Sequence, residues 1–247
     1  NKFSIIVNRN LFLKNSFLDT IQKRIINSEL SKDGSYLYSD LPYYFFKSFL
    51  EKKYNQSLDQ LLKTKLLNPI GANNTTYLPL NLFSISKIVP SEIDNYFRQD
   101  TIRGYVHDMG AAMQGGIGGH AGLFSNANDI SKIMQMYIQS GNYGSKIFFS
   151  KSTIDYFNKC YYCETGNRRG LGFDKPQIDD SSPTCGCVPM SSFGHSGFTG
   201  TYAWGDPENQ IVYVFLSNRT YPSMNNNNLS NYNIRTEIQR IIYNSLK

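Results

Sequence analysis

Two short segments carry side chains that could transfer protons around a reacting group. Tyr38-Ser39-Asp40 places a phenol two residues before a carboxylate, and His195-Ser196-Gly197 places an imidazole and a hydroxyl beside a glycine. The second segment superficially matches a G-x-S-x-G nucleophile elbow, but the fifth position is Phe198 and the chain continues into a predicted strand rather than a helix. We therefore do not expect Ser196 to be an elbow nucleophile.

Four cysteines form two close pairs, Cys160-Tyr-Tyr-Cys163 and Cys185-Gly-Cys187. Two such pairs could present four thiolates to a structural zinc ion, although disulfides in an exported protein, or buried thiols, are the favoured interpretations. The three histidines, His107, His120 and His195, are widely separated and form no H-E-x-x-H pattern. We therefore expect no catalytic metal and no cofactor.

A glycine-rich segment from Gly110 to Gly122 contains six glycines in thirteen residues. It lacks the Gly-Lys-Ser/Thr ending of a phosphate-binding P-loop, and it lacks the strand and acidic residue of a dinucleotide fold. We expect the glycines to allow tight backbone turns against a neighbouring surface.

The elements that must position these residues follow from periodicity and from capping signals. Apolar residues at helical spacing predict five helices: Ser16–Leu30 capped by Ser16, Leu41–Tyr54, Ser57–Leu67, Asn126 to Gly141 capped by Asn126, and Asn231–Lys247. Asn73–Asp100 shows no steady period and is expected to be irregular. Ser192–Trp204 and Gln210–Asn218 predict an antiparallel hairpin, with a turn at Gly205–Asn209. We expect the last helix to pack on this hairpin through Ile234, Ile238, Ile241 and Ile242.

Four motifs in this order resemble the class C β-lactamase and penicillin-binding-protein serine hydrolase family: Tyr36-Leu-Tyr-Ser-Asp-Leu41, Asn68-Pro-Ile-Gly71, Gly118-Gly-His-Ala-Gly-Leu-Phe-Ser125 and Gly194-His-Ser-Gly-Phe-Thr-Gly-Thr201. More narrowly, the chain is similar to the hydrolase domain that follows a family-3 glycoside hydrolase (N-acetylglucosaminidase type) in some bacterial envelope proteins. The resemblance implies an α+β fold, with a helical subdomain beside an antiparallel sheet flanked by helices and the active site between them.

One element of the family pattern is absent. The nucleophilic serine of S-x-x-K should precede Tyr38, but the chain's single match, Ser84-Ile-Ser-Lys87, lies downstream and is interpreted as a chance match. We therefore interpret residues 1–247 as the C-terminal part of one β-lactamase-like domain with an incomplete sheet. Residues 12–190 are expected to be mostly helical or irregular, and 191–247 to form the sheet hairpin and the C-terminal helix.

The resemblance also implies roles for individual residues. Tyr38 is the candidate phenol that shares proton transfer with the missing Lys, the alternative being a packed core aromatic. Asp40 stands where the family usually has Asn, and an ionised carboxylate cannot donate a hydrogen bond, so it would pair with that Lys instead. The backbone N–H of Phe198 would be one oxyanion-hole donor.

Three further positions are expected to contact substrate. Gly197 allows a substrate to approach the strand closely, Ser196 belongs to the same triplet, and His120 in the glycine-rich segment would line the pocket. His195 replaces the family's Lys with a group that is mostly neutral at pH 7, so it offers a weaker positive field. The alternative for His195 is a structural strand histidine.

Composition excludes other functions. The net charge of +6 from 25 basic and 19 acidic residues is thinly spread, which argues against a nucleic-acid partner. The longest apolar stretch, Ile211–Leu216, is too short to span a bilayer. The chain begins at Asn1 with no apolar leader, so we interpret it as processed or as a piece of a longer exported protein of the periplasm or cell envelope.

The leading hypothesis is an acyl-enzyme serine hydrolase acting on an ester, an amide or a peptidoglycan-like peptide. Its partners would be a small-molecule or peptidoglycan-derived substrate and a covalently attached upstream portion that supplies the nucleophile, without which this chain would be inactive. Two alternatives stay open. One is a non-catalytic binding module on the same fold, and the other is an interaction domain held together by zinc.

Overall fold

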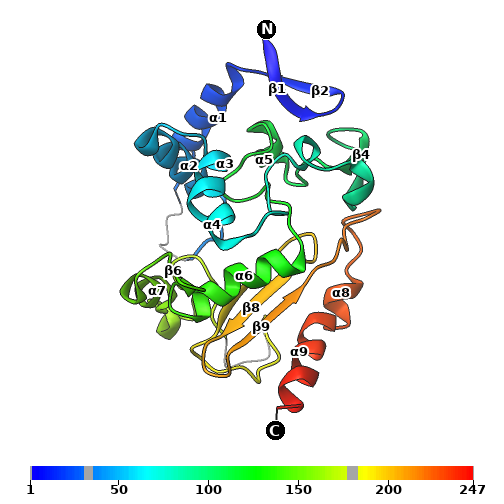
Figure 1. Cartoon of the computed structure of the whole chain (residues 1–247). Helices are drawn as coiled ribbons and strands as arrows, with labels where there is room; N and C mark the ends of the chain where they lie inside the picture. The colour runs from blue at the N-terminus through cyan, green and yellow to red at the C-terminus, as the bar shows by residue number, and fades with distance from the viewer. Residues whose placement is uncertain (1, 31–35, 177–182, 247) are drawn as a thin grey trace. The chain divides into compact units, whose positions relative to one another are not determined.

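The computed structural model of the chain describes residues 2–30, 36–176 and 183–246 (Figure 1). These residues form two compact units. The first, called here the N-terminal unit, comprises Asn1–Leu67, Thr75–Phe124 and Tyr221–Ser223. The second, the C-terminal unit, comprises Asn68–Asn74, Ser125–Thr220 and Met224–Lys247. The structure of each unit is given separately below.

The N-terminal unit combines helices with two antiparallel strand pairs. Its elements in chain order are β1 (Phe3–Asn8), β2 (Leu11–Lys14), α1 (Phe17–Ile26), α2 (Leu41–Tyr54), α3 (Leu58–Leu62), the π-helical turn η1 (Lys63–Leu67), the 3₁₀ turns η2 (Pro79–Asn81) and η3 (Ile85–Lys87), β3 (Pro90–Asp94), β4 (Asp100–Arg103) and α5 (Met109–Met113). β1 pairs with β2 and β3 pairs with β4. Val7 of β1 packs against Val106 and against Ala111 and Ala112 of α5 to form a buried core.

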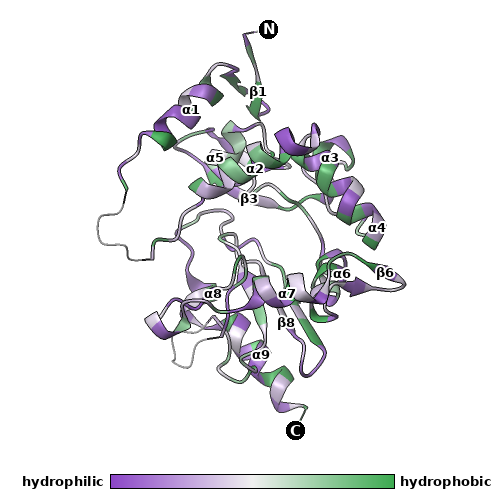
Figure 2. Ribbon diagram, turned by 90° about the vertical axis from the view of Figure 1, so that its left-hand side faces the viewer, coloured by the Kyte–Doolittle hydropathy of each residue, from purple (hydrophilic) through white to green (hydrophobic). Residues whose placement is uncertain are grey.

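The predicted helices of this unit are present, with local differences. Figure 2 shows that α1 and α3 carry both hydrophilic and hydrophobic residues. Leu61 of α3 is buried, whereas α1 has no buried residue. Ser16 is the N-cap residue of α1, but its side chain makes no capping hydrogen bond. Within Asn73–Asp100, which was predicted to be irregular, the structure contains β3. This strand begins with a proline, and its apolar and polar residues do not alternate. The sequence therefore contains no pattern that predicts a strand here.

The C-terminal unit is built around a three-stranded antiparallel sheet in the order β7-β8-β9. Its elements are α4 (Asn68–Ile70), α6 (Ala127–Ile138), β5 (Asn142–Tyr143), β6 (Lys146–Ile147), α7 (Lys151–Asn158), the 3₁₀ turn η4 (Cys163–Thr165), β7 (Phe193–Ser196), β8 (Tyr202–Asp206), β9 (Ile211–Phe215), α8 (Asn228–Asn231) and α9 (Ile234–Asn244). As predicted, the Asn126 side chain caps α6 by accepting a hydrogen bond from the Asp129 backbone N–H at 2.9 Å.

Helices cover both faces of this sheet (Figure 1). On one face, Met134 and Ile138 of α6 pack against Phe193 of β7. On the other, Tyr202 and Trp204 of β8 pack with partly buried isoleucines of α9, Ile238 and Ile242. Residues in a strand alternate between faces, so β8 contributes to both layers. The prediction that the last helix packs on the sheet is confirmed.

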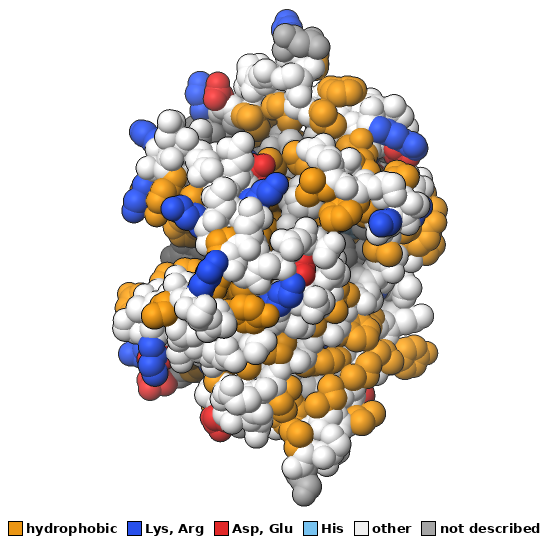
Figure 3. All heavy atoms as spheres, in the orientation of Figure 1, with side chains coloured by type: hydrophobic (Ala, Val, Ile, Leu, Met, Phe, Trp, Pro, Cys, Tyr) orange, Lys and Arg blue, Asp and Glu red, His pale blue; other side chains and the backbone are white. Residues whose placement is uncertain are grey.

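Two details of the predicted hairpin and helix were wrong. Ser192–Trp204 is not one strand, because the Gly197 N–H donates to the Thr201 carbonyl at 2.8 Å and closes a turn between β7 and β8. Ile241 does not face the sheet, since its side chain is 69% exposed. Figure 3 shows hydrophobic side chains gathered along the C-terminal helix at the lower right.

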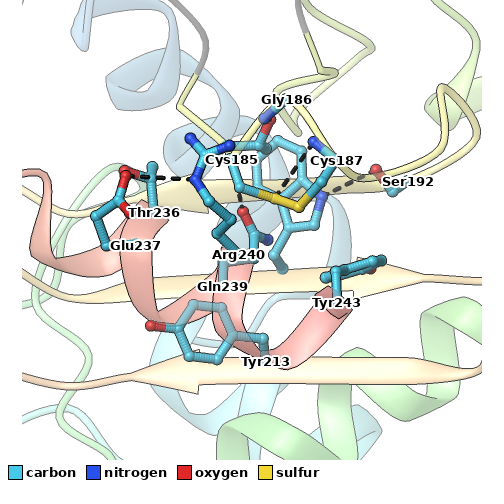
Figure 4. The surroundings of a disulfide bond; sticks show 12 residues. Cys185, Gly186, Cys187, Ser192, Tyr213, Thr236, Glu237, Gln239, Arg240 and Tyr243 are labelled. Carbon is cyan, nitrogen blue, oxygen red and sulfur yellow. Dashed lines mark hydrogen bonds and ion pairs between the residues drawn. A yellow bond between two sulfur atoms is a disulfide. The ribbon is translucent and has the colours of Figure 1, made fainter. Parts of the chain in front are cut away.

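All four cysteines form disulfides, Cys160–Cys163 and Cys185–Cys187. The zinc interpretation of Cys160, Cys163, Cys185 and Cys187 is therefore wrong, because oxidised cysteines have no thiolate for a metal. The second disulfide lies beside α9 (Figure 4), where the buried Gln239 side chain accepts a hydrogen bond from the Cys185 N–H at 3.0 Å. In the described part of the chain, no helix has the length and apolarity needed to cross a membrane.

Candidate active site

Tyr38 and Asp40 lie immediately before α2 in the N-terminal unit. Tyr38 is 58% exposed, so it is not a packed core aromatic in the described structure. The Ser39 hydroxyl accepts a hydrogen bond from the Leu41 N–H at 3.2 Å, and the Asp40 carbonyl accepts one from the Tyr43 N–H at 3.0 Å. Asp40 is the N-cap residue of α2, but its side chain makes no capping hydrogen bond. Its carboxylate is therefore not used to begin the helix.

The Asp40 carboxylate belongs to a cluster with Asp108 and His120. One ligand atom from each of the three side chains lies within 4.8 Å of the other two. His120 Nε2 is 2.9 Å from Asp108 Oδ1, and the His120 side chain is only 4% exposed. Its ring stacks on Tyr44 of α2, with 5.0 Å between ring centroids. Asp40 and His120, which the sequence pointed to separately, are thus brought together.

Asp108 was not predicted from the sequence, and two interactions fix it. Its side chain caps α5 by accepting the Ala111 N–H at 2.6 Å. The buried Arg98 guanidinium donates to the carbonyls of Val106 and His107, which holds the preceding backbone in place. Burial by itself would raise the pKa of Asp108, but the hydrogen bonds from His120 and Ala111 outweigh burial, and the net shift of its pKa is downward. Asp108 is therefore ionised near neutral pH.

The glycine-rich segment places His120 against α2. A Cβ atom on Gly119 would lie 2.4 Å from the Tyr43 carbonyl oxygen, so only glycine allows this approach. The Tyr77 hydroxyl donates to the Gly118 carbonyl at 2.9 Å and anchors the segment from the other side. The expectation that these glycines permit close packing against a neighbouring surface is confirmed.

The cluster is an anionic environment. Burial first, and then the negative charges of Asp108 and Asp40, raise the pKa of Tyr44. Such a site suits a cationic group, for example a lysine ammonium. Two carboxylates and an imidazole could also ligate a divalent cation, but in this structure His120 Nε2 and Asp108 Oδ1 form a hydrogen bond with each other.

His195 lies on β7 in the C-terminal unit, and both of its ring nitrogens have partners. Nδ1 is 2.7 Å from the Ser196 carbonyl oxygen, and Nε2 is 3.1 Å from Nη1 of Arg169. A carbonyl can only accept and a guanidinium can only donate, so Nδ1 carries the proton and Nε2 accepts. The contacts assign His195 to a neutral tautomer.

Arg169 was not predicted as a site residue, because the sequence shows only a basic pair at this point. It lies in a tight backbone hairpin, Arg168–Lys175, in which the Lys175 N–H donates to the Arg168 carbonyl. Asp174 exchanges backbone hydrogen bonds with Gly194 of β7, at 2.8 and 3.1 Å, which places the hairpin beside the strand. The buried Asp174 carboxylate forms ion pairs with both Arg168 and Arg169.

The turn after β7 contains Gly197 and Phe198. A Cβ atom on Gly197 would lie 2.2 Å from Thr201 Oγ1, so a side chain there would disrupt the turn. The Phe198 carbonyl accepts a hydrogen bond from Arg219 at 3.0 Å, and the Arg219 guanidinium lies 4.9 Å from the Phe198 ring. Ser196, Gly197 and Phe198 are therefore held close to His195, as their adjacency requires. The family resemblance also implies that Tyr38 and His195 face one shared active site. The two residues belong to separate units, and their convergence stays a prediction.

These observations define a class of protein: an α+β fold with a Tyr-x-Asp element at a helix start and a His-Ser-Gly triplet on a sheet strand. The family profile described as beta-lactamase matches residues 15–233, which is most of the chain. The chain belongs to the β-lactamase family.

Curated relatives agree with this assignment. The chain is 31% identical over 206 residues to an Escherichia coli (strain K12) protein that carries the provisional name D-alanyl-D-alanine carboxypeptidase, covering 78% of this chain and 47% of that protein. A Salmonella enteritidis protein with the same provisional name is 29% identical over 226 residues, or 86% of this chain and 51% of that protein. The chain thus spans about half the length of the curated relatives it matches.

Solved structures support the β-lactamase/transpeptidase-like fold. The octameric penicillin-binding protein homologue from Pyrococcus abyssi matches with a TM-score of 0.58 and 19% identity, over 94% of this chain and 51% of that one. Simvastatin synthase (LovD) from Aspergillus terreus matches with a TM-score of 0.61 and 14% identity, over 92% of this chain and 61% of that one. At these identities the similarity shows the fold alone.

Proposed function

We propose that the intact protein is a serine hydrolase that works through an acyl-enzyme, with its nucleophile in an S-x-x-K segment upstream of this chain. The observation that carries the proposal is the position of the Tyr38–Asp40 element. In a chain of the β-lactamase family, this element lies at the start of α2, beside the anionic Asp108–His120 pair.

The anionic cluster supports a role for Asp40 as the partner of the upstream lysine. Asp40 cannot donate a hydrogen bond when ionised, but with Asp108 it supplies the negative charge that a lysine ammonium requires. Such a pair would hold the lysine next to the serine and next to the Tyr38 phenol. The substitution of Asp for the usual Asn then exchanges a substrate contact for a contact that positions the general base.

The chemical steps follow from the family mechanism. The serine Oγ attacks the acyl carbon while its proton passes to the lysine and Tyr38 pair, and an ester bond forms. The bond to the leaving alcohol or amine then breaks, and the leaving group takes the proton back. Water attacks the acyl-enzyme in the reverse sense and releases the acid. The N–H groups of Phe198 and of the serine itself would stabilise the oxyanion.

We propose an ester, an amide or a peptidoglycan-like peptide as the substrate, in the periplasm or elsewhere in the cell envelope. The provisional carboxypeptidase name of the relatives supports a peptide of this kind. Two disulfides support export, since disulfides persist in oxidising compartments. Fusion to a family-3 glycoside hydrolase stays a prediction from the sequence motifs.

A fluorescent β-lactam tests the proposal. The full-length protein is incubated with the reagent, digested, and the labelled peptide is identified by mass spectrometry. We expect one adduct, on the serine of an S-x-x-K upstream of Tyr38, and its loss when that serine is changed to alanine. An adduct on Ser84 or Ser196, or no adduct in protein shown to be folded, would contradict the proposal.

One observation favours the binding module as a second candidate. Both ring nitrogens of His195 are already engaged, by Ser196 and by Arg169, so this residue does not present the cation that the family's triplet usually supplies. A folded protein that binds the β-lactam reversibly, with no covalent adduct, would support this second function.

A further inference from the structure

We propose that the pocket at the C-terminal end of α7 binds a small organic carboxylate, whose negative charge pairs with the buried ammonium group of Lys175. The inference goes beyond the proposed function and does not rest on it, because none of the residues assigned to acyl transfer lines this pocket. It assigns a ligand class to a part of the C-terminal unit that the sequence motifs do not mark.

The pocket lies at the end of β7 opposite to the His-Ser-Gly triplet. Ser191 lines it just before the strand begins at Phe193, whereas the triplet begins at His195. Its volume is about 470 Å³, which is within the range of sites for small molecules. Its walls include Asn158, Lys159, the Cys160–Cys163 disulfide, Met190 and Ser191.

The Lys175 side chain brings a positive charge to the inner wall of this pocket. Lys175 is 5% exposed, and its Nζ donates to Asn158 Oδ1 at 3.1 Å and to the Ser191 carbonyl at 3.0 Å. The Phe193 ring lies 5.8 Å from Nζ. An ammonium group carries three protons, so two neutral acceptors leave one donor and the whole positive charge for a ligand.

The charge of Lys175 has no counter-charge in the described part of the chain. No carboxylate among these residues lies within ion-pair distance of its ammonium. Asp155, which also lines the pocket, pairs with the exposed Lys151, and Glu208 accepts a hydrogen bond from the Ser191 hydroxyl. Burial lowers the pKa of Lys175 to about 8, because the charged form is poorly solvated there.

These features define the ligand. A buried charge is costly unless an opposite charge and hydrogen bonds compensate it, and a carboxylate provides both. The exposed Met190 side chain and the disulfide offer apolar surface to the rest of the molecule. The occupant is therefore an organic acid and not an inorganic ion.

Three probes of one shape test this choice: benzoate, benzamide and benzylammonium. Each is titrated into full-length protein with ¹³C-labelled methionine methyl groups, and the Met190 signal is assigned with Met190→Leu. We expect benzoate to shift the Met190 signal and to bind about 10-fold or more tighter than benzamide, the range for a hydrogen bond between charged groups. Benzylammonium should not shift this signal.

Two lysine variants locate the charge. Lys175→Met should weaken benzoate binding about 10-fold or more by the same reasoning. Lys159→Met is the matched control, because it removes the same charge from an exposed side chain of the same pocket, where Lys159 lies 5.3 Å from the Tyr161 ring. We expect it to change the affinity less than about 3-fold, since exposed charges contribute little.

Asn158→Asp tests the proposal with Lys175 in place. The new carboxylate would stand where Asn158 Oδ1 accepts from Lys175, so it would supply the counter-charge from within the chain. We expect benzoate affinity to fall about 10-fold or more, with no loss of melting temperature, because the buried ammonium gains an ion-pair partner. This variant decides the question if Lys175→Met does not fold.

The pH dependence of binding gives a separate readout. Benzoate pairs with the protonated lysine, so its affinity should be steady from pH 6 to pH 7 and should fall as the pH rises through about 8, while the affinity of benzamide stays constant.

Three results would overturn the proposal. The first is equal affinity for benzoate and benzamide, and the second is an equal effect of the two lysine variants. Asp179 and Asp180 follow Lys175 in the sequence and lie outside the described residues. The third result is therefore a gain in benzoate affinity of about 10-fold in the double variant Asp179→Asn/Asp180→Asn, which would show that the chain supplies its own carboxylate to the pocket.

Discussion

His120 Nε2 lies 2.9 Å from Asp108 Oδ1, and both groups lie beside the Asp40 carboxylate at the start of α2. This hydrogen bond joins His120, near the end of the glycine-rich segment, to Asp108, the N-cap residue of α5. It places a second negative charge near the Tyr38–Asp40 element, which the sequence motif does not contain. In the proposed function, this second charge would help Asp40, which stands where the family usually has an amide, to hold the upstream lysine.

Asp108→Asn should destabilise the protein near neutral pH. The change weakens a charge-assisted hydrogen bond to His120, so we expect a loss of about 1–2 kcal/mol of unfolding free energy. The pKa of Asp108 is lowered in the folded state, so its contribution is present above the ordinary carboxyl range and is lost as the pH falls through the folded-state value. The difference between wild type and variant should therefore shrink from pH 7 to pH 3.

Urea denaturation at several pH values measures this difference. Asp155→Asn is the matched control, because Asp155 pairs with Lys151 on the exposed surface of α7 and should contribute little. A cost for Asp108→Asn that stays constant down to pH 3 would contradict the ionised state of Asp108.

Gly119→Ala should separate the glycine-rich segment from α2. The new methyl group would lie 2.4 Å from the Tyr43 carbonyl oxygen, so the backbone must move, at a cost of about 1–3 kcal/mol. Gly144→Ala is the control. It has no atom within 4 Å of the added Cβ and a φ of +58°, so it reports backbone strain alone. We expect β-lactam acylation of the full-length protein to slow in the first variant only, and equal rates in both would show that this approach does not support the site.

Parts of the fold could be predicted where a short stretch of sequence carries one clear indication of a helix or a strand. The Asn126 cap and the apolar spacing of α6 indicated that helix, and the aromatic and β-branched residues indicated the sheet. The turn at Gly197–Thr201 was not predicted, because the residues on both sides of it are typical of strands and indicate one continuous strand. The prediction for Ile241 was wrong because the four isoleucines cover a wider arc of the helix than the side of α9 that packs on the sheet. Ile238 and Ile242 lie on that side, and Ile241 is exposed.

The candidate site was predicted only where family motifs exist. Asp40, His120 and His195 each belong to a motif, but Asp108 and Arg169 contact them only through the tertiary structure. An Asp before a helical Gly-Ala-Ala stretch is a capping signal that could have indicated Asp108. No local pattern distinguishes Arg169 from Arg168, since only the hairpin beside β7 sets them apart.

Gln239→Leu should destabilise the C-terminal unit. Gln239 is fully buried on α9 and accepts the Cys185 N–H, as Figure 4 shows. Leucine would leave that N–H unpaired, at a cost of about 1–3 kcal/mol. Gln135→Leu, at an exposed position of α6, should change the unfolding free energy by less than about 0.5 kcal/mol. Similar melting temperatures for the two variants would argue against the importance of this hydrogen bond.

The central claim is that Tyr38 transfers protons to and from an upstream serine. Its most direct test is the rate at which a fluorescent β-lactam acylates full-length protein carrying Tyr38→Phe, with Tyr36→Phe as the control, since Tyr36 is two residues away and 54% exposed. We predict that Tyr38→Phe slows acylation by about 100-fold or more, the usual contribution of a positioned general acid or base, while Tyr36→Phe stays within about 2-fold of wild type. Acylation of folded Tyr38→Phe at the wild-type rate would contradict the account.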